Sequence, residues 1–329
     1  MFSKKLPLYL VLPAIALTSG LTFWITSRSM TPAEAETDPS IITCSNSKLR
    51  LSGYKYIRPL LLTETACEAE LLMPVKVELM NLLNYYKGNG TISNGSIYLR
   101  ELNEGEWIAI EEDETYLPGS LMKVPELITF MKMNERQPGL LNKKVLYNGP
   151  IITDKNPHYL SKSLEAGKTY SVKELLYYMI VYSDNNATVL LNNMMDLGIF
   201  VKTFTDLGLK APDVKQKDIP ITAVGYSRFM RSIFNATYLS ADDSEFCAEL
   251  LSQSEFRNGI RSGVPSQIPV AHKFGEAGDA NISHFSESGI IYINNNPYLL
   301  TVMTKGKQLD LLPGVAKEIS RKVFEKLSA

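Results

Sequence analysis

The sequence predicts an α/β fold of the α+β type, in which an antiparallel five-stranded sheet is flanked by helices and joined to a helical subdomain, with an N-terminal transmembrane helix. Segments with β character lie at both ends of the globular part and helical segments lie between them. This order is typical of an antiparallel sheet with helices gathered at one edge. An uncharged run over residues 6–25, preceded by Lys4 and Lys5, is long enough to cross a membrane as a helix.

Composition excludes several classes of protein. The chain has 329 residues, of which 45% are hydrophobic, so it can bury a sizeable core and is not a disordered chain. With 34 basic and 35 acidic side chains, its formal net charge is -1. A nucleic-acid-binding protein would show a basic excess or stripe, so we expect no nucleic-acid partner.

The N-terminal part predicts a membrane-anchored, extracytoplasmic protein. Residues 1–29 are expected to act as an uncleaved signal anchor, and Ala33-Glu34-Ala35 offers a cleavage site for the alternative, a signal peptide. Residues 30–69 mix Pro, Thr, Ser and acidic residues without a sustained period, which predicts a linker or stalk with some ordered contacts. Cys44 and Cys67 could form a disulfide in an oxidising compartment, and their spacing leaves the question open.

Residues 70–329 predict the catalytic domain, with a helical subdomain inserted at about residues 134–257. A cleft between the sheet and this subdomain is the expected site. The segments with helical periodicity are residues 71–86, 120–133, 175–181, 187–195 and 311–327. The expected strands are residues 96–99, 107–110, 269–274, 288–294 and 298–305.

Ser120-Leu121-Met122-Lys123 places a hydroxyl and an amine three residues apart at the start of a predicted helix, and therefore on one face of it. A serine is a weak nucleophile at its ordinary pKa, and a lysine in a desolvated pocket can lose its charge and take the hydroxyl proton. Backbone N–H groups at a helix N-terminus can help to hold an oxyanion. Taken alone, the pattern also fits a capping serine beside a solvated lysine.

Two further patterns follow in order along the chain. Ser183-Asp184-Asn185 comes after an apolar run and before another helical stretch, where it also suits a helix N-cap. Lys273-Phe274-Gly275 lies on a predicted strand at the edge of the sheet, lining the expected cleft. Three such elements in this order, on helix, helix junction and strand, indicate a catalytic constellation.

With these motifs the chain resembles the penicillin-recognising serine hydrolases, most closely the class A β-lactamase-like branch, which carries S-x-x-K, S-D-N and K-T-G. The resemblance covers about residues 70–329 and implies a β-lactamase/transpeptidase-like fold. It implies that Ser120 is the acylated nucleophile and that Lys123 is its general base or proton relay. Ser183 would pass a proton to the leaving nitrogen.

The same resemblance implies the groups that bind the substrate, a small-molecule β-lactam or a cell-wall peptide. Asn185 would bind the amide side chain of the substrate, and Lys273, in one motif with Gly275, would steer its carboxylate. The backbone N–H groups of Ser120 and Glu276 would form the oxyanion hole. No cofactor is implied, and three scattered histidines give no metal-ligand spacing.

The chain departs from the family pattern where a substrate carboxylate would bind. Phe274 stands in the place of a Thr or Ser hydroxyl, and Ser288 stands where many class A enzymes carry an arginine. Glu276 brings a negative charge to the same region, which is unfavourable for a β-lactam carboxylate unless Lys273 offsets it. Glu276 is also a candidate for a substitute base.

The family's Ω-loop glutamate, which activates the water that hydrolyses the acyl-enzyme, has no counterpart between residues 175 and 244. Residues 209–220 offer only Asp213 and Asp218. We therefore expect a β-lactamase-like serine hydrolase that forms a Ser120 acyl-enzyme with β-lactams or D-Ala-D-Ala-like peptides and releases it slowly.

Two other hypotheses stay open. One is a DD-peptidase or transpeptidase that acts on peptidoglycan. The other is a catalytically silent peptidoglycan-binding domain, which the altered third motif favours and the intact residues of the first two motifs oppose.

Among the remaining polar residues, we expect structural roles. His272 should point away from the lysine of the third motif, because side chains alternate along a strand, and form a buried hydrogen bond. His158 and His284 are expected in loops, Arg261 in a structural ion pair, and Cys247 as a small apolar residue on a helix.

Overall fold

The computed structural model describes residues 44–151, 158–159, 161–216, 219–293 and 296–328. The part that contains the sheet runs from Ser45 to Ala329. The predicted membrane span at residues 6–25 and the cleavage site at residues 33–35 lie outside the described residues. Within those that are described, no helix has the length and apolar character that crossing a membrane requires.

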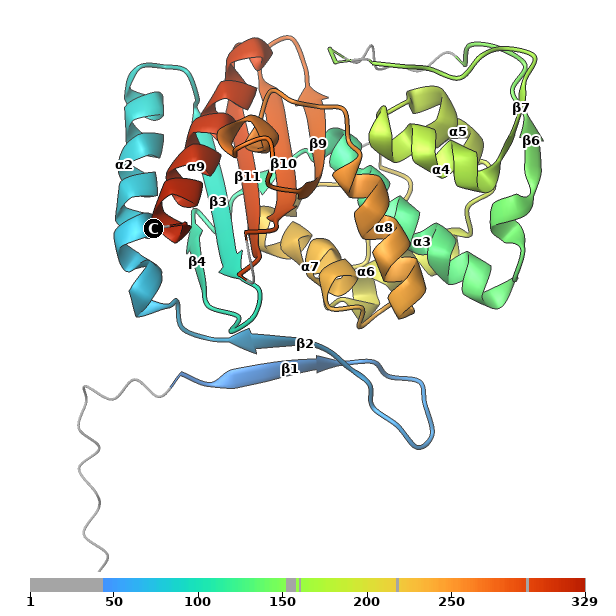
Figure 1. Ribbon diagram of the computed structural model, residues 1–329, viewed down its shortest axis with the longest axis horizontal. Helices are drawn as coiled ribbons and strands as arrows, with labels where there is room; N and C mark the ends of the chain where they lie inside the picture. Colours follow the sequence, from blue (N-terminus) through green and yellow to red (C-terminus); the bar gives the residue numbers. More distant parts are fainter. Residues whose placement is uncertain (1–43, 152–157, 160, 217–218, 294–295, 329) are drawn as a thin grey trace, which may run out of the picture. The chain divides into compact units, whose positions relative to one another are not determined.

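A five-stranded antiparallel sheet with the order β4-β3-β11-β10-β9 lies at the centre of this unit, as predicted (Figure 1). The strand over residues 107–110 has the predicted bounds, and the other strands extend beyond the predicted ranges at one end or both. Most of their residues are buried, so little alternation marks where they end. The strands are β3 (Asn94–Glu101), β4 (Trp107–Ile110), β9 (Val270–Gly278), β10 (Ser283–Ile291) and β11 (Tyr298–Gly306).

Helices cover both faces of the sheet (Figure 1). On one face lie α2 (Met73–Gly88) and α9 (Leu312–Leu327), and α7 (Ala223–Phe234) contacts β3 and β11 from the other. The alternation of β11 shows both layers: Leu299 and Met303 belong to the apolar cluster around α7, whereas Leu300 and Val302 belong to the cluster around α2 and α9. The sheet is therefore buried between two cores.

Helices dominate the segment for which a helical subdomain is predicted. They are α3 (Lys123–Arg136), α4 (Val172–Val181), α5 (Asn185–Asn192), α6 (Leu197–Asp206), α7 and α8 (Ala241–Ser252). Two pairs of very short strands were not predicted, because two or three residues are too few to show a period. These are β5 (Thr115–Tyr116) with β8 (Ile221–Thr222), and β6 (Lys144–Leu146) with β7 (Thr169–Ser171). Short 3₁₀ turns are η1 (Glu70–Leu72), η2 (Gly119–Met122), η3 (Leu140–Asn142), η4 (Ile260–Gly263) and η5 (Leu309–Leu311).

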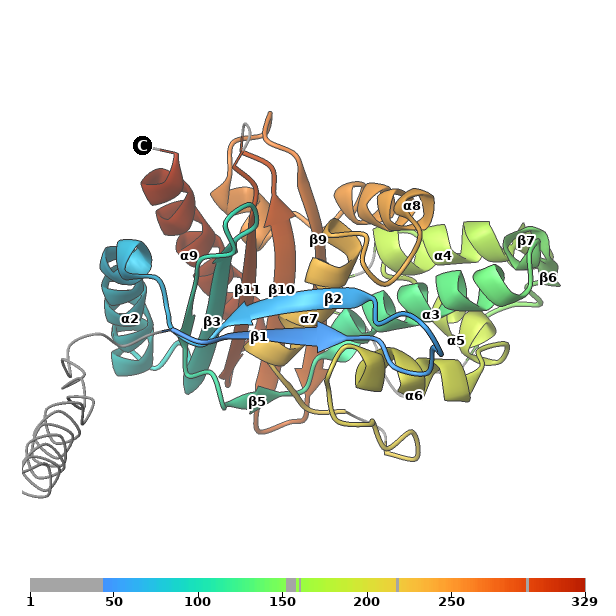
Figure 2. The ribbon, with the colours of Figure 1, turned by 90° about the horizontal axis from the view of Figure 1, so that it is seen from below.

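Part of the predicted linker forms a hairpin of β1 (Asn46–Arg50) and β2 (Leu60–Thr65), which lies below the sheet in Figure 1 and crosses in front of its strands in Figure 2. Arg231 of α7, only 2% exposed, donates to the Glu64 carboxylate at 2.7 Å and to the Thr63 carbonyl at 2.9 Å. Arg100 of β3 also donates to Glu64, at 3.5 Å. These bonds attach the hairpin to the sheet and to α7.

The cysteine pairing that the sequence left open is present. Cys44 and Cys67 are both disulfide-bonded, and the third cysteine, Cys247, is free. Cys247 is buried on α8, where burial raises the pKa of its thiol, so it is a packed apolar residue as predicted.

Candidate active site

Ser120 lies in η2, a tight turn directly before α3, and not in the first turn of an α-helix as predicted. The turn forms because Gly119 adopts a φ of 52°, a left-handed conformation that glycine accepts readily. Side chains three residues apart are eclipsed in a 3₁₀ turn, so Ser120 and Lys123 still lie on one side. Ser120 is half-buried and Lys123 is buried.

The first two motifs meet at the amine of Lys123. Its Nζ donates to the Ser183 carbonyl at 2.6 Å, to the Ser183 hydroxyl at 3.2 Å and to the Asn185 side-chain oxygen at 2.9 Å. Ser183 adopts a φ of 56°, which is rare for a residue with a side chain. Such strained residues are concentrated at functional sites, so the conformation agrees with the predicted role of this motif.

Asp184, the middle residue of the second motif, is 1% exposed and supports its neighbours. Its carboxylate accepts the N–H of Asn186 at 2.7 Å, which caps α5, and the N–H of Leu164 at 2.8 Å. The sequence predicted the cap but not the second bond, which depends on a distant loop.

The third motif reaches the same point from β9, the edge strand of the sheet. Lys273 is fully buried, and its Nζ donates to the Ser183 hydroxyl at 3.0 Å and to the Phe274 carbonyl at 3.0 Å. Burial lowers the pKa of Lys273 well below its usual range, and the positive charge of Lys123 lowers it further. Two amines that share one hydroxyl favour a state in which one of them is neutral.

The turn that carries Ser120 and strand β9 approach each other through two glycines. A Cβ atom on Gly275 would lie 2.0 Å from the Pro118 carbonyl oxygen and 2.9 Å from the Ser120 nitrogen. A Cβ atom on Gly119 would lie 2.1 Å from the Glu276 carbonyl oxygen. No side chain fits at either position, so the glycines set the distance between the two backbones.

This approach orients the backbone of Glu276. Its carbonyl faces Gly119, and the N–H and C=O of one residue in a strand point to the same side. The N–H of Glu276 therefore points from the free edge of β9 toward the turn that holds Ser120. This is the arrangement that the predicted oxyanion hole requires.

The Glu276 side chain is held by the segment that contains His158 and Tyr159. Its carboxylate accepts the N–H of His158 at 3.2 Å. Burial raises the pKa of Glu276, and the N–H groups of Tyr159 and His158 and the charges of His158 and Lys273 oppose this rise.

Asp213 and Asp218 are the two aspartates that the sequence offers as a base for the water that would hydrolyse the acyl-enzyme. Asp213 is exposed, and its carboxylate accepts the N–H of Lys215 at 3.0 Å within its own turn. Asp218 lies outside the part that the structure describes. Ser288 is buried inside the sheet, with its hydroxyl 2.7 Å from that of Thr301.

Two predictions about polar residues need correction. His284 lies in β10, not in a loop, and its Nδ1 accepts the N–H of Leu117 at 3.3 Å; the buried start of this strand has no visible alternation. Arg261 is structural, but among the described residues it bonds to backbone carbonyls and not to an acid. These carbonyls belong to Val264, Pro265 and Ser266.

The prediction for His272 is confirmed. Its side chain is fully buried, with Nδ1 2.7 Å from the Glu287 carboxylate.

Sequence reasoning did not find the aromatic residues that pack over the third motif. Phe256 stacks on Phe274 at 3.9 Å between ring centroids, and Tyr159 contacts both rings edge-on. These residues come from segments far apart in the chain, so no local pattern relates them. Of these three aromatic residues, only Phe274 could be singled out from the sequence, because it stands in the third motif.

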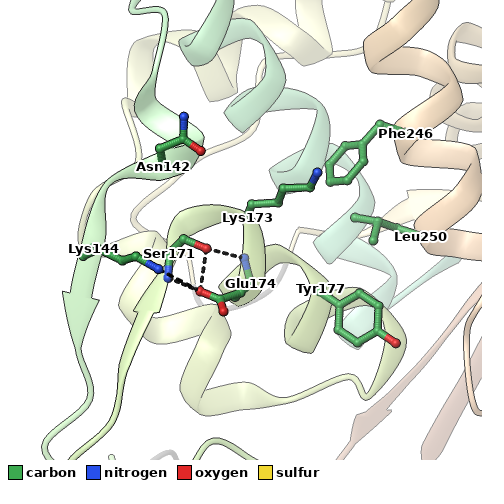
Figure 3. Close-up of a pocket in the computed structure, with 8 residues that line it drawn as sticks. All are labelled: Asn142, Lys144, Ser171, Lys173, Glu174, Tyr177, Phe246 and Leu250. Carbon is green, nitrogen blue, oxygen red and sulfur yellow. Dashed lines mark hydrogen bonds and ion pairs between the residues drawn. The ribbon is translucent and has the colours of Figure 1, made fainter.

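A pocket of about 430 Å³ lies away from the three motifs, and none of their residues lines it (Figure 3). Its polar groups are engaged in local structure: Ser171 and Glu174 form the capping box of α4, and the Lys173 amine lies over the Phe246 ring. The lining residues are Asn142, Lys144, Ser171, Lys173, Glu174, Tyr177, Phe246 and Leu250. In the described part of the chain, no cluster of three or more His, Cys, Asp or Glu is arranged to hold a metal ion.

Solved structures with the same fold include hydrolases and penicillin-binding proteins. A class A β-lactamase from Mycobacterium abscessus has a TM-score of 0.65 at 19% identity, over 78% of this chain and 100% of that chain. A β-lactamase from Sphaerobacter thermophilus has a TM-score of 0.64 at 17% identity, over 76% and 96% of the two chains. An acyl-enzyme complex of a PBP-A variant with penicillin G has a TM-score of 0.64 at 17% identity, over 78% and 97%.

At these identities the structural matches show the fold. Sequence comparison with curated proteins returns no match. Residues 74–328 match the model of the β-lactamase enzyme family (Beta-lactamase2), and this range contains all three motifs that meet at Ser183. The chain therefore belongs to the β-lactamase enzyme family.

Proposed function

We propose that this protein is a serine hydrolase that forms a covalent acyl-enzyme at Ser120 with β-lactams or related amides and releases the acyl group slowly. The observation that supports this most directly is the convergence of two buried amines, Lys123 and Lys273, on the hydroxyl of Ser183. A neutral amine beside the nucleophile supplies a base, and a hydroxyl that accepts two hydrogen bonds keeps its own proton for donation.

In the proposed acylation, the Ser120 oxygen attacks the carbonyl carbon while its proton passes to neutral Lys123. The negative charge that develops on the carbonyl oxygen is held by the N–H groups of Ser120 and Glu276. The C–N bond then breaks as Ser183 gives its proton to the leaving nitrogen, and Lys123 returns a proton to Ser183. Asn185, which bonds to Lys123 at 2.9 Å, positions the amine.

Slow release follows from the acidic groups available. Hydrolysis of the ester needs a water activated by a base, and Asp213 is exposed and occupied by the N–H of its own turn. No Glu occurs between residues 175 and 244. The acyl-enzyme is therefore expected to persist.

Intact-mass spectrometry of the full chain with penicillin G and with its methyl ester tests the proposal. We expect a mass increase equal to the whole compound, because the opened ring stays attached, that lasts for minutes or longer. Ser120→Ala should abolish it, and Ser252→Ala, an exposed serine on α8, should not. An adduct that persists in Ser120→Ala would rule out Ser120 as the nucleophile.

We also propose that the enzyme is anchored in the membrane and faces the extracytoplasmic side. The disulfide of Cys44 and Cys67 supports an oxidising compartment, and the uncharged run at residues 6–25 supports the anchor. Alkaline carbonate should leave the full chain in the membrane pellet and extract a chain without residues 1–29. Release of both chains would contradict the anchor.

A further inference from the structure

The amine of Lys273 is not presented to a substrate carboxylate. Its side chain is fully buried, its Nζ donates to Ser183 and to the Phe274 carbonyl, and it lies 4.2 Å from the centroid of the Phe274 ring. Burial also favours its neutral form. A carboxylate would have to displace these contacts to reach the amine.

The ring of Phe274 is fixed in place by packing. It is 3% exposed and stacks on Phe256 at 3.9 Å with an interplanar angle of 16°. Tyr159 meets both rings edge-on, at 5.3 and 5.1 Å, and its hydroxyl donates to the Glu255 carbonyl at 2.9 Å. The ring therefore remains over the amine, in the place where the family's hydroxyl would bind a carboxylate.

Glu276 lies two residues after Phe274 and so on the same face of β9. Its carboxylate is oriented by the N–H of His158 at 3.2 Å. An anionic group beside the scissile bond would approach this carboxylate and be repelled by it, whereas an amine would pair with it.

We propose that Phe274 and Glu276 make this enzyme selective for acyl compounds whose group beside the scissile C–N bond is neutral or carries an amine, and that they reject compounds with a carboxylate there. This selectivity rests on the proposed acylation of Ser120. It separates the chain from hydrolases that require the carboxylate of their substrate.

Three compounds with one β-lactam ring test the proposal: penicillin G, its methyl ester and its 2-aminoethyl amide. The measurement is the second-order rate constant for the adduct at Ser120 on the full chain, divided by the rate constant of hydroxide-catalysed ring opening of each compound. We expect the ester and the amide to react faster than penicillin G by at least about tenfold.

The variants assign the selectivity to its residues. Glu276→Gln should raise the rate with penicillin G and lower the rate with the amine, and Phe274→Thr should raise the rate with penicillin G further. Glu112→Gln, an exposed carboxylate elsewhere, should leave all three rates unchanged. Phe274→Thr opens a packed cluster and could prevent folding. The isosteric Glu276→Gln then still tests the proposal.

The outcomes distinguish the two proposals. A Ser120-dependent adduct that forms fastest with penicillin G, or that is insensitive to Glu276→Gln, overturns the selectivity and leaves the role of Ser120 intact. Absence of a Ser120-dependent adduct with all three compounds overturns the proposed function, and the selectivity with it.

Discussion

At the scale of single residues, the hydroxyl of Ser183 accepts hydrogen bonds from Lys123 at 3.2 Å and from Lys273 at 3.0 Å. The pKa of Lys273 is lowered first by burial and then by the charge of Lys123. Repulsion between two amines is mutual, so each makes the other easier to deprotonate. The pair is therefore expected to supply a neutral amine as a base at a pH well below the pKa of an isolated lysine.

The pH dependence of acylation tests this coupling. The rate of adduct formation should rise with pH as the pair loses a proton, with an inflection below the usual pKa of a lysine. In Lys273→Met the remaining amine loses its charged neighbour, so the inflection should move to higher pH. Lys168→Met, an exposed lysine, is the control. An inflection that stays at the wild-type pH would contradict the coupling.

The stability of the fold should depend on pH through the same group. The pKa of Lys273 is lower in the folded chain than in the unfolded chain, so the unfolded chain binds more protons between these two values. Stability should therefore rise with pH across this window and fall as the pH drops through the folded-state pKa. Lys273→Met should flatten this dependence, as measured by the thermal midpoint at a series of pH values.

Gly275→Ala tests the close approach between β9 and the turn of Ser120. The added Cβ would lie 2.0 Å from the Pro118 carbonyl, so the two backbones must separate. We expect the free energy of unfolding to fall by about 1–3 kcal/mol. The acylation rate should fall by about a hundredfold, since a displacement of the reacting groups by about 1 Å is enough to cause such a loss. Gly314→Ala on α9, which meets nothing within 4 Å, should leave the acylation rate unchanged and should not lower the stability. Wild-type acylation by Gly275→Ala would exclude this role.

At the scale of elements, the junction between α4 and α5 positions the second motif. The left-handed backbone of Ser183 directs its carbonyl to Lys123, and the Asp184 carboxylate fixes the start of α5. The buried Asp184 carboxylate accepts the N–H groups of Leu164 and Asn186 and so satisfies two backbone donors at this junction. The junction thus joins local capping to the geometry of the site.

Asp184→Ala should cost more than the loss of an ordinary helix cap. The cap accounts for about 1 kcal/mol, and the buried N–H of Leu164, left without an acceptor, adds about 1–3 kcal/mol. Asp196→Ala removes the exposed cap of α6 and should cost only about 1 kcal/mol. Urea unfolding measures both, and equal losses would argue against the second bond to Leu164.

At the scale of the whole molecule, the hairpin of β1 and β2 is part of the folded unit. Leu61 and Leu62 are buried in the core beside α7, and Glu64 bonds to the buried guanidinium groups of Arg231 and Arg100. A chain that begins at residue 70 would leave these two cations without their carboxylate. Activity measurements therefore need the hairpin.

Glu64→Ala tests the attachment of the hairpin. Removing one partner of a buried ion network costs about 3 kcal/mol, because the remaining charges stay desolvated. Glu114→Ala removes a more exposed pair with Lys305 and should cost at most about 1 kcal/mol. The free energy of unfolding measures both. Similar losses in the two variants would mean that the hairpin is only loosely attached.

The sequence predicted most of the sheet and the long helices, because apolar runs mark the strands and periodic burial marks the helices. It also predicted which motifs meet, through the resemblance. It predicted an α-helix from residue 120, where the structure has a 3₁₀ turn packed against β9, and it placed His284 in a loop because a buried strand shows no alternation. Part of the predicted linker proved to be a hairpin, since its attachment is made by residues distant in the chain.

What the sequence by itself determined is the family, the order of the motifs and the substitutions at Phe274 and Glu276. These are properties of residue type and spacing, which the chain carries directly. What only the tertiary structure decided is the burial of Lys273, its bond to Ser183 and the stack of Phe256 on Phe274. Burial and ring contacts depend on which distant segments pack together, and this packing determines whether a lysine is a cation for the substrate or a buried amine that orients a hydroxyl.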